Sequence, residues 1–210
     1  MKHPDRPFLV AITGGIASGK SVVSKWFEEQ NFLVFYTDRI GHDLFNDQYF
    51  KNKIEDIFGK EITIDGSIDR AKLGEIIFNS ADKRKQLNEL LHPEIRKRIQ
   101  QIIETSSNKI LIFEIPLLFE NGLQNAFDLT INISARNEIR IKRIMGRNKI
   151  SKETAQKRID SQMAEPDKQK LVDVNISNEK NVEELHLHLH KLLPLINKIK
   201  KKNVKKITEI

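Results

Sequence analysis

The feature that most restricts the fold of this chain is an apolar run leading directly into a glycine-rich segment. Residues 8–13 (FLVAIT) are continuously apolar, as expected of a strand buried on both faces of a parallel sheet. Residues 21–30 follow with apolar side chains at helical spacing, and residues 32–36 (FLVFY) form a second buried strand. This order of strand, turn, helix and strand predicts a βαβ unit with parallel strands and a right-handed crossover.

The rest of the chain alternates further strands with helical segments. Three more apolar runs predict strands, the last of them at an edge of the sheet: residues 110–115, 129–133 and 172–176. Helical spacing of apolar or basic side chains extends over residues 136–147, 152–163 and 182–199. Residues 38–101 are mostly helical and charged in pattern, with a turn at Asp65 and Gly66. The sequence therefore predicts an α/β fold, a doubly wound five-stranded parallel sheet with a helical insertion.

Composition narrows the classes of protein and partner. The 210 residues suit one large α/β domain with insertions, and 39% hydrophobic residues suffice for a core. The formal net charge of +7 favours anionic partners, among which nucleic acid, phosphorylated metabolites and acidic lipids all qualify. Part of this charge lies in residues 198–206, which we expect to be the solvated, frayed end of a helix. The absence of cysteine excludes disulfides, thiolate metal sites and cysteine catalysis.

No segment of the sequence has the pattern of a signal peptide or a membrane span. Residues 1–7 are polar, and the apolar run that follows them is too short for the hydrophobic region of a signal peptide. We therefore expect a cytoplasmic protein without a membrane partner, and a monomer that self-associates at most weakly.

Residues 14–21 (GGIASGKS) match the pattern Gly-x₄-Gly-Lys-Ser of a phosphate-binding loop (P-loop) between a strand and a helix. Glycines let the backbone N–H groups point inward as a nest for a polyphosphate, and the helix that follows adds its positive dipole end. We expect Lys20 to reach the β- and γ-phosphates and Ser21 to bind Mg²⁺ through its hydroxyl. The predicted ATP-binding residues are Gly14, Gly15, Ile16, Ala17, Ser18, Gly19, Lys20, Ser21 and Val22.

A phosphate-binding loop alone does not specify a reaction, so a GTPase, a motor ATPase and a small-molecule kinase are all compatible with it. Two segments partly match GTPase motifs, residues 38–41 (DRIG) and residues 148–151 (NKIS). However, Asp38 follows the second strand too soon after Lys20, and Ser151 stands where a guanine-binding carboxylate is needed. These mismatches argue against a GTPase.

Asp38 is a candidate for acting on the hydroxyl group that would accept a phosphate, because it stands just past the end of the second strand. Ligand-binding groups collect at the carboxyl ends of strands in α/β sheets, so we expect Asp38 to face phosphates held by the neighbouring first strand. A carboxylate there can accept a proton from an attacking hydroxyl or bind Mg²⁺ through water. The alternative role is an N-cap for a helix starting near Ile40.

Arg140, Arg143 and Arg147 are spaced by three and four residues and therefore share one face of a helix. Phosphoryl transfer is accelerated mainly by cations around the migrating group, so these are candidate catalytic residues together with Asp38 and Lys20. A mobile lid that closes over ATP would supply them. The alternative is a solvated basic face, but its position after the fourth strand of a P-loop protein favours the lid.

The order and spacing of several further motifs resemble the dephospho-coenzyme A kinase family, up to about Asn178. The matching segments are TGGIASGKS at 13–21, YTD at 36–38, IDR at 68–70 with Leu73, LHP at 91–93 with Ile95 and Arg96, PLLFE at 116–120, and Arg143 and Arg147 followed by Arg158, Ser161 and Gln162. Each motif is weak by itself, whereas their order and spacing together are specific.

This resemblance implies transfer of the γ-phosphate of ATP to the ribose 3′-hydroxyl of dephospho-coenzyme A, the last step of coenzyme A synthesis. It implies a nucleotide-binding core (residues 1–37, 110–135 and 164–210), a helical substrate domain (38–109) and a lid (136–163). It further implies that Asp38 acts on the acceptor hydroxyl and that Arg70, His92 and Arg96 bind the substrate. Nucleic acid is then not expected as a partner.

Four positions depart from the family pattern. Ala17 replaces a glycine, which is tolerated only if φ is negative there. Val22 replaces a threonine, Tyr36 replaces an aspartate and Ser177 replaces an aspartate. Two alternatives to the proposed reaction stay open on the residues alone. They are another P-loop kinase acting on a nucleoside monophosphate or a small alcohol, and a nucleic-acid-binding P-loop ATPase that uses its basic lid and tail.

Overall fold

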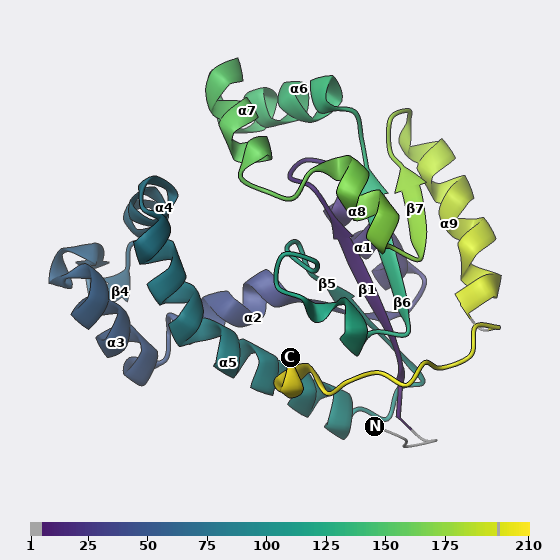
Figure 1. Ribbon diagram of the computed structural model, residues 1–210, viewed down its shortest axis with the longest axis horizontal. Coiled ribbons are helices and arrows are strands. Elements are labelled where there is room, and N and C mark those ends of the chain that lie inside the picture. The colour runs from purple at the N-terminus through teal and green to yellow at the C-terminus, as the bar shows by residue number, and fades with distance from the viewer. Residues whose placement is uncertain (1–5, 197) are drawn as a thin grey trace. The chain divides into compact units, whose positions relative to one another are not determined.

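The computed structural model describes residues 6–196 and 198–210, which fall into two compact units (Figure 1). The first unit comprises the described parts of residues 1–36 and 103–210, and the second comprises residues 37–102. Residues 136–163, the predicted lid, group with the first unit. The division into core, substrate domain and lid stays a prediction. Among the described helices, none is long and apolar enough to cross a bilayer.

The first unit is built on a parallel sheet of five strands, as predicted, and the order of the strands is β2-β5-β1-β6-β7. The strands are β1 (Phe8–Gly14), β2 (Leu33–Tyr36), β5 (Ile110–Glu114), β6 (Leu129–Ser134) and β7 (Val174–Ser177). Every residue of β1 and β6 is buried, which explains the continuous apolar sequence of residues 8–12 in β1. The predicted edge position of the last strand is confirmed.

The position of β2 differs from the sequence-based expectation. β5 lies between β1 and β2, so the second strand is not a neighbour of the first. β2 forms the other edge of the sheet, and 45% of Leu33 is exposed. The expectation of a buried strand beside β1 was therefore wrong. Apolar spacing indicates that a segment enters a sheet, but it does not specify which strand lies beside it.

Helices of the first unit pack on the sheet and on each other. α1 (Lys20–Glu29) and α9 (Val182–Ile196) share one buried core with β1, β6 and β7, to which Trp26, Phe27 and Leu189 contribute. After β6, helices α6 (Asn137–Asn148) and α7 (Lys152–Asp160) form a pair with a small core of their own. The sequence did not predict α8 (Glu165–Leu171), nor the short 3₁₀ helix η2 (Leu123–Ala126).

The C-terminal tail is ordered rather than frayed, and here too the sequence-based expectation was wrong. α9 ends at Ile196, and residues 198–210 run extended along the unit to the 3₁₀ helix η3 (Ile207–Glu209) (Figure 1). Val204 and Ile207 are 4% and 1% exposed. The tail is held because these two apolar side chains find buried positions among its many lysines.

The second unit is mainly helical, with one hairpin at the predicted turn. Its helices are α2 (Thr37–Leu44), α3 (Gln48–Phe58), η1 (Lys60–Ile62), α4 (Arg70–Asn79) and α5 (Ala81–Thr105), whose last residues belong to the first unit. β3 (Thr63–Ile64) and β4 (Ser67–Ile68) pair antiparallel around Asp65 and Gly66. Asp47 and Asp69 cap α3 and α4 with their side chains. A separate core, which includes Leu44 and Phe58, holds the unit together.

Candidate phosphate-binding site

The site begins where β1 runs into residues 14–21, which we call the phosphate loop. Gly14 and Gly19 have φ values of 149° and 108°. A Cβ atom on Gly14 would lie 2.3 Å from the carbonyl oxygen of Ile133, and one on Gly19 would lie 2.0 Å from Asn178 Nδ2. Only glycine fits these two positions, so the loop requires both for its curl.

Ala17 adopts a positive φ of 60°, so the condition under which alanine was expected to be tolerated, a negative φ, is not met. The left-handed conformation costs an alanine about 1 kcal/mol relative to glycine. Its methyl group packs, together with Ile16, against the small core of α6 and α7. This packing offers a partial physical reason why alanine is retained at a position that favours glycine.

Side chains from outside the loop hold its carbonyl groups. Arg143 Nη1 donates to the carbonyl oxygens of Ala17 and Ser18 at 3.2 and 3.3 Å, and Arg143 Nη2 donates to the carbonyl of Asn178 at 3.0 Å. Asn178 Nδ2 donates to the carbonyl of Ser18 at 2.7 Å. Because C=O and N–H groups of a peptide point in opposite directions, donors on the outside favour amides that point into the loop, as an anion nest requires.

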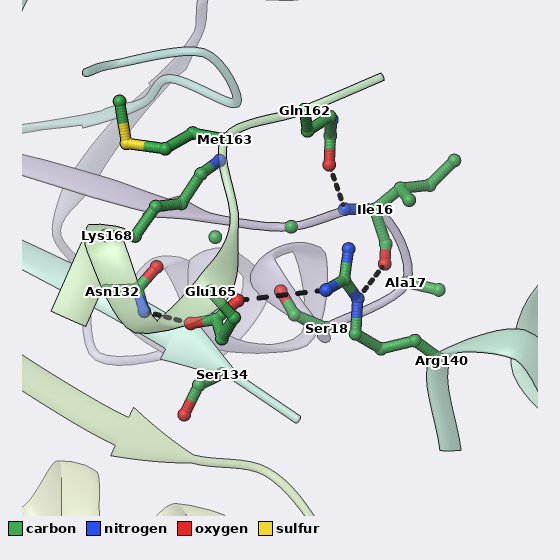
Figure 2. A network of polar contacts seen from close by, with 12 residues as sticks. Ile16, Ala17, Ser18, Asn132, Ser134, Arg140, Gln162, Met163, Glu165 and Lys168 are labelled. Carbon is green, nitrogen blue, oxygen red and sulfur yellow. Dashed lines mark hydrogen bonds and ion pairs between the residues drawn. The ribbon is translucent and has the colours of Figure 1, made fainter. Parts of the chain in front are cut away.

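Arg140 and Gln162 hold the main chain of Ile16 (Figure 2). Arg140 Nε donates to the Ile16 carbonyl at 3.0 Å, and the Ile16 N–H donates to Gln162 Oε1 at 2.7 Å. Arg140 is 5% exposed, and its Nη1 lies 3.9 Å from Glu165 Oε2. Burial lowers the pKa of the Arg140 guanidinium, and Glu165 partly offsets this, but arginine stays charged at neutral pH.

A second layer of polar contacts fixes the segment that carries Gln162 and Glu165 (Figure 2). Asn132 Nδ2 donates to Glu165 Oε1 at 2.6 Å. Lys168 is fully buried, and its Nζ lies 2.9 Å from Glu120 Oε1 in an ion pair that lacks hydrogen-bond geometry. The same Glu120 oxygen accepts the N–H of Met163 at 3.0 Å. The linker between α7 and α8 is thereby tied to the loop that follows β5.

Lys20 and Ser21 stand at the start of α1, as predicted. Lys20 Nζ donates to the carbonyl oxygens of Gly14 and Gly15 at 2.8 and 3.1 Å, so the ammonium group lies against its own loop. Ser21 and Val22 are exposed. The loop positions the lysine charge next to the amides at which a polyphosphate would bind.

Glu114 is a candidate site residue that the sequence reasoning missed. It ends β5, in register with Ile12 of β1, and Ser24 Oγ of α1 donates to its Oε2 at 2.5 Å. The available signal was a charged residue at the end of an otherwise apolar run. Within the described residues, no group of three or more His, Cys, Asp or Glu side chains is arranged to hold a metal ion. Mg²⁺ in phosphate sites needs only one or two protein oxygens besides phosphate and water, a set that Ser21 and Glu114 fit.

Arg147 does not join the loop with the other two arginines. It is exposed near the end of α6, and its Nε donates to the side chain of the adjacent Asn148 at 3.1 Å. The three arginines that were expected to act together from one face of a helix therefore have different partners. Arg140 and Arg143 are engaged by loop carbonyls, whereas Arg147 lies at the surface.

The remaining predicted residues lie in the second unit. Asp38 is exposed in the first turn of α2, which starts at Thr37, so Asp38 is not an N-cap at Ile40. Arg70 begins α4, and its guanidinium lies 5.7 Å from the ring centre of Phe45.

His92 and Arg96 share one face of α5 beside a hollow of about 530 Å³. Burial, and then the charge of Arg96, lower the pKa of His92, so its imidazole is neutral at pH 7. The hollow is lined by Ala81, Arg84, Lys85, Asn88, Glu89, His92, Pro93 and Arg96. Its cationic residues suit an anionic group, and Arg70 is not among the lining residues.

Comparison with known proteins identifies the family. Residues 8–184 match the family model described as dephospho-CoA kinase. The chain belongs to the dephospho-CoA kinase family. It is 38% identical over 178 residues to the dephospho-CoA kinase of Fusobacterium nucleatum, covering 84% of this chain and 92% of that protein. It is 40% identical over 190 residues to that of Oceanobacillus iheyensis, covering 88% of this chain and 96% of the relative.

Solved structures agree with this assignment to the dephospho-CoA kinase family. The dephospho-CoA kinase of Campylobacter jejuni superposes with a TM-score of 0.68 at 32% identity, covering 90% of this chain and 97% of the other. A protein from Thermus thermophilus has a TM-score of 0.79 at 28% identity, covering 90% and 98%. A shikimate kinase from Bacteroides thetaiotaomicron, with a TM-score of 0.53 at 9% identity and coverage of 90% and 98%, shares the fold alone. The fold is thus that of the P-loop kinases.

Proposed function

We propose that this chain transfers the γ-phosphate of ATP to the ribose 3′-hydroxyl of dephospho-coenzyme A, giving coenzyme A and ADP. The observation that carries this proposal is the family match over residues 8–184, a range that contains every residue of the phosphate loop. The resemblance seen in the sequence led to the same reaction. The loop supports the ATP side because its carbonyls are held from outside by Arg140, Arg143 and Asn178.

On the ATP side, we assign ATP to residues 14–22, with the phosphates on Lys20 and on the loop amides other than that of Ile16, which donates to Gln162. Lys20 would exchange the carbonyls of Gly14 and Gly15 for phosphate oxygens. Ser21 and Glu114 would supply oxygen ligands for Mg²⁺, which neutralises charge on the phosphates when bound. The first hydrogen-bonded turn of α1 adds its dipole at the same place.

On the acceptor side, we assign to Asp38 the proton of the 3′-hydroxyl. The hydroxyl oxygen forms a new bond to the γ-phosphorus. The bond between the γ-phosphorus and the oxygen that bridges it to the β-phosphorus breaks, and ADP leaves with the electron pair. Arg96 and neutral His92, with Arg84 and Lys85 on the same face of α5, would bind the anionic part of the acceptor. Arg70 keeps its predicted substrate role, and exposed Arg147 is the lid arginine that we assign to the transferred phosphate.

The deciding experiment is transfer of label from γ-labelled ATP, with Mg²⁺, to a panel of acceptors. The panel contains dephospho-coenzyme A, nucleoside monophosphates, small alcohols and single-stranded RNA. We expect label only in coenzyme A. Label in a nucleoside monophosphate or an alcohol would favour another P-loop kinase, and ATP hydrolysis stimulated by RNA would favour a nucleic-acid-dependent ATPase. We also propose that the protein acts in the cytoplasm as a monomer, a state that gel filtration tests.

A further inference from the structure

We propose that Arg140 and Gln162 act together as a clamp on Ile16 that sets the phosphate loop for ATP before ATP arrives. In this proposal Arg140 is a positioning residue and not a ligand of the transferred phosphate. We call the pair the Ile16 clamp. It rests only on the ATP-binding part of the proposed function.

The two side chains reach Ile16 from different elements (Figure 2). Arg140 extends from α6 to the Ile16 carbonyl, and Gln162 extends from the linker after α7 to the Ile16 N–H, at 3.0 and 2.7 Å. Donor and acceptor of the same residue are thus both held by side chains more than 120 positions away in sequence. Fixing both groups restricts the φ and ψ angles of Ile16 together.

The two side chains of the clamp are themselves held by further polar contacts within the first unit. Arg140 is buried against Glu165, which accepts from Asn132 on β6. Gln162 precedes Met163, whose N–H donates to Glu120, the partner of buried Lys168. The side chains that hold Ile16 therefore have little freedom to follow the loop if it relaxes.

The loop needs such a support because of the residue that follows. Ala17 has a φ of 60°, a left-handed conformation that is costly for alanine. If Ile16 were released, Ala17 could return to a negative φ, and this would turn the adjoining amides out of the nest. ATP would then have to reorder the loop on binding. The apparent Kd for ATP would equal the intrinsic Kd divided by the fraction of molecules whose loop is already in the binding-competent form. Arg140 contacts both Ile16 and Glu165, and its Nε already donates to the Ile16 carbonyl.

The experiment measures ATP dissociation constants by calorimetry without acceptor, and then kcat at saturating substrates. The variants are Gln162→Met, which keeps side-chain length but removes the acceptor, Arg140→Met, and the double variant. Gln156→Met is the matched control, since the hydrogen bonds of Gln156 to described residues go to Asn137 and Asp160 and not to the phosphate loop. We expect the Kd for ATP to rise about five- to tenfold for each single variant, with kcat within about threefold of wild type. The control should bind ATP normally.

The double variant tests whether the two side chains act on one residue. Because either loss frees Ile16, the double variant should weaken ATP binding far less than the product of the single effects. Multiplied effects, an unchanged Kd in Gln162→Met, or a kcat loss of a hundredfold in Arg140→Met without a change in Kd would each overturn the clamp. Thermal melting verifies folding, and if Arg140→Met does not fold, Gln162→Met alone decides.

The readout separates this inference from the proposed function. ATP binding needs no acceptor, so failure to phosphorylate dephospho-coenzyme A would overturn the proposed reaction and leave the clamp intact. Conversely, an active enzyme whose Gln162→Met variant binds ATP like the wild type would retain its proposed reaction and lose the clamp.

Discussion

The two ends of the parallel sheet use similar polar groups for opposite purposes. At the amino end, fully buried Asp128 accepts from both terminal nitrogens of Arg6 at 2.6 and 2.7 Å, and from the N–H groups of Leu9 and Lys202 at 2.8 and 2.7 Å. Its carboxylate is thus satisfied by the chain itself. At the carboxyl end, Arg140 and Arg143 donate to loop carbonyls, and we propose that the amides of the same loop bind phosphate.

This difference shows how one sheet separates stability from binding. The amino end joins the N-terminal residues, β6 and the C-terminal tail through a charge pair that needs no ligand. The carboxyl end keeps a costly conformation at Ala17 and positive φ values at Gly14 and Gly19. We propose that this loop geometry serves ATP binding rather than stability. Substitutions at the two ends should therefore affect different measurements.

The largest expected effect is at the carboxyl end. Lys20→Met should lower kcat/KM about a thousandfold, since it removes a cation from the phosphates, while stability changes little. Initial-rate kinetics and thermal melting measure the two quantities. Lys25→Met is the matched control, because Lys25 is an exposed residue of the same helix. Wild-type activity in Lys20→Met would contradict the assignment of the loop.

The corresponding change at the amino end is Asp128→Asn. It leaves buried Arg6 without its countercharge and should cost about 3 kcal/mol of unfolding free energy, measured by urea denaturation. Activity per folded molecule should be unchanged. Asp167→Asn, at an exposed ion pair with Lys170, should cost less than about 1 kcal/mol. A comparable loss of unfolding free energy in both variants would show that the buried pair of Arg6 and Asp128 stabilises the fold no more than an exposed ion pair does.

A third variant asks whether the chemistry at the carboxyl end also depends on the second unit. Asp38→Asn should lower kcat about a hundredfold or more, because the acceptor hydroxyl loses its base, while the Kd for ATP stays nearly unchanged. Asp43→Asn, on the exposed side of the same helix, serves as the control. Unchanged turnover would remove Asp38 from the mechanism.

The smallest effect concerns the strain in the loop. Ala17→Gly should raise the unfolding free energy by about 0.5 to 1 kcal/mol, because glycine accepts the positive φ. Ala71→Gly, in the first turn of α4, should instead destabilise by up to about 1 kcal/mol. Equal losses in the two variants would mean that packing of the Ala17 methyl group outweighs its backbone conformation.

Much of the first unit was predictable from local sequence. Apolar runs located all five strands, and GGIASGKS located the phosphate loop between a strand and a helix. Both signals depend on the residue types within one short segment, which is why sequence alone carries them. The same holds for the turn at Asp65 and Gly66, where φ is positive at both residues.

Contacts between distant segments decided the rest. The insertion of β5 between β1 and β2, the burial of Val204 and Ile207, and the bond from Arg140 to the Ile16 carbonyl join residues far apart in the chain. The sequence by itself determined that a phosphate loop follows a buried strand. Only the tertiary structure decided that Ala17 is left-handed and that Arg140 holds the loop, because both depend on neighbours that no local pattern specifies.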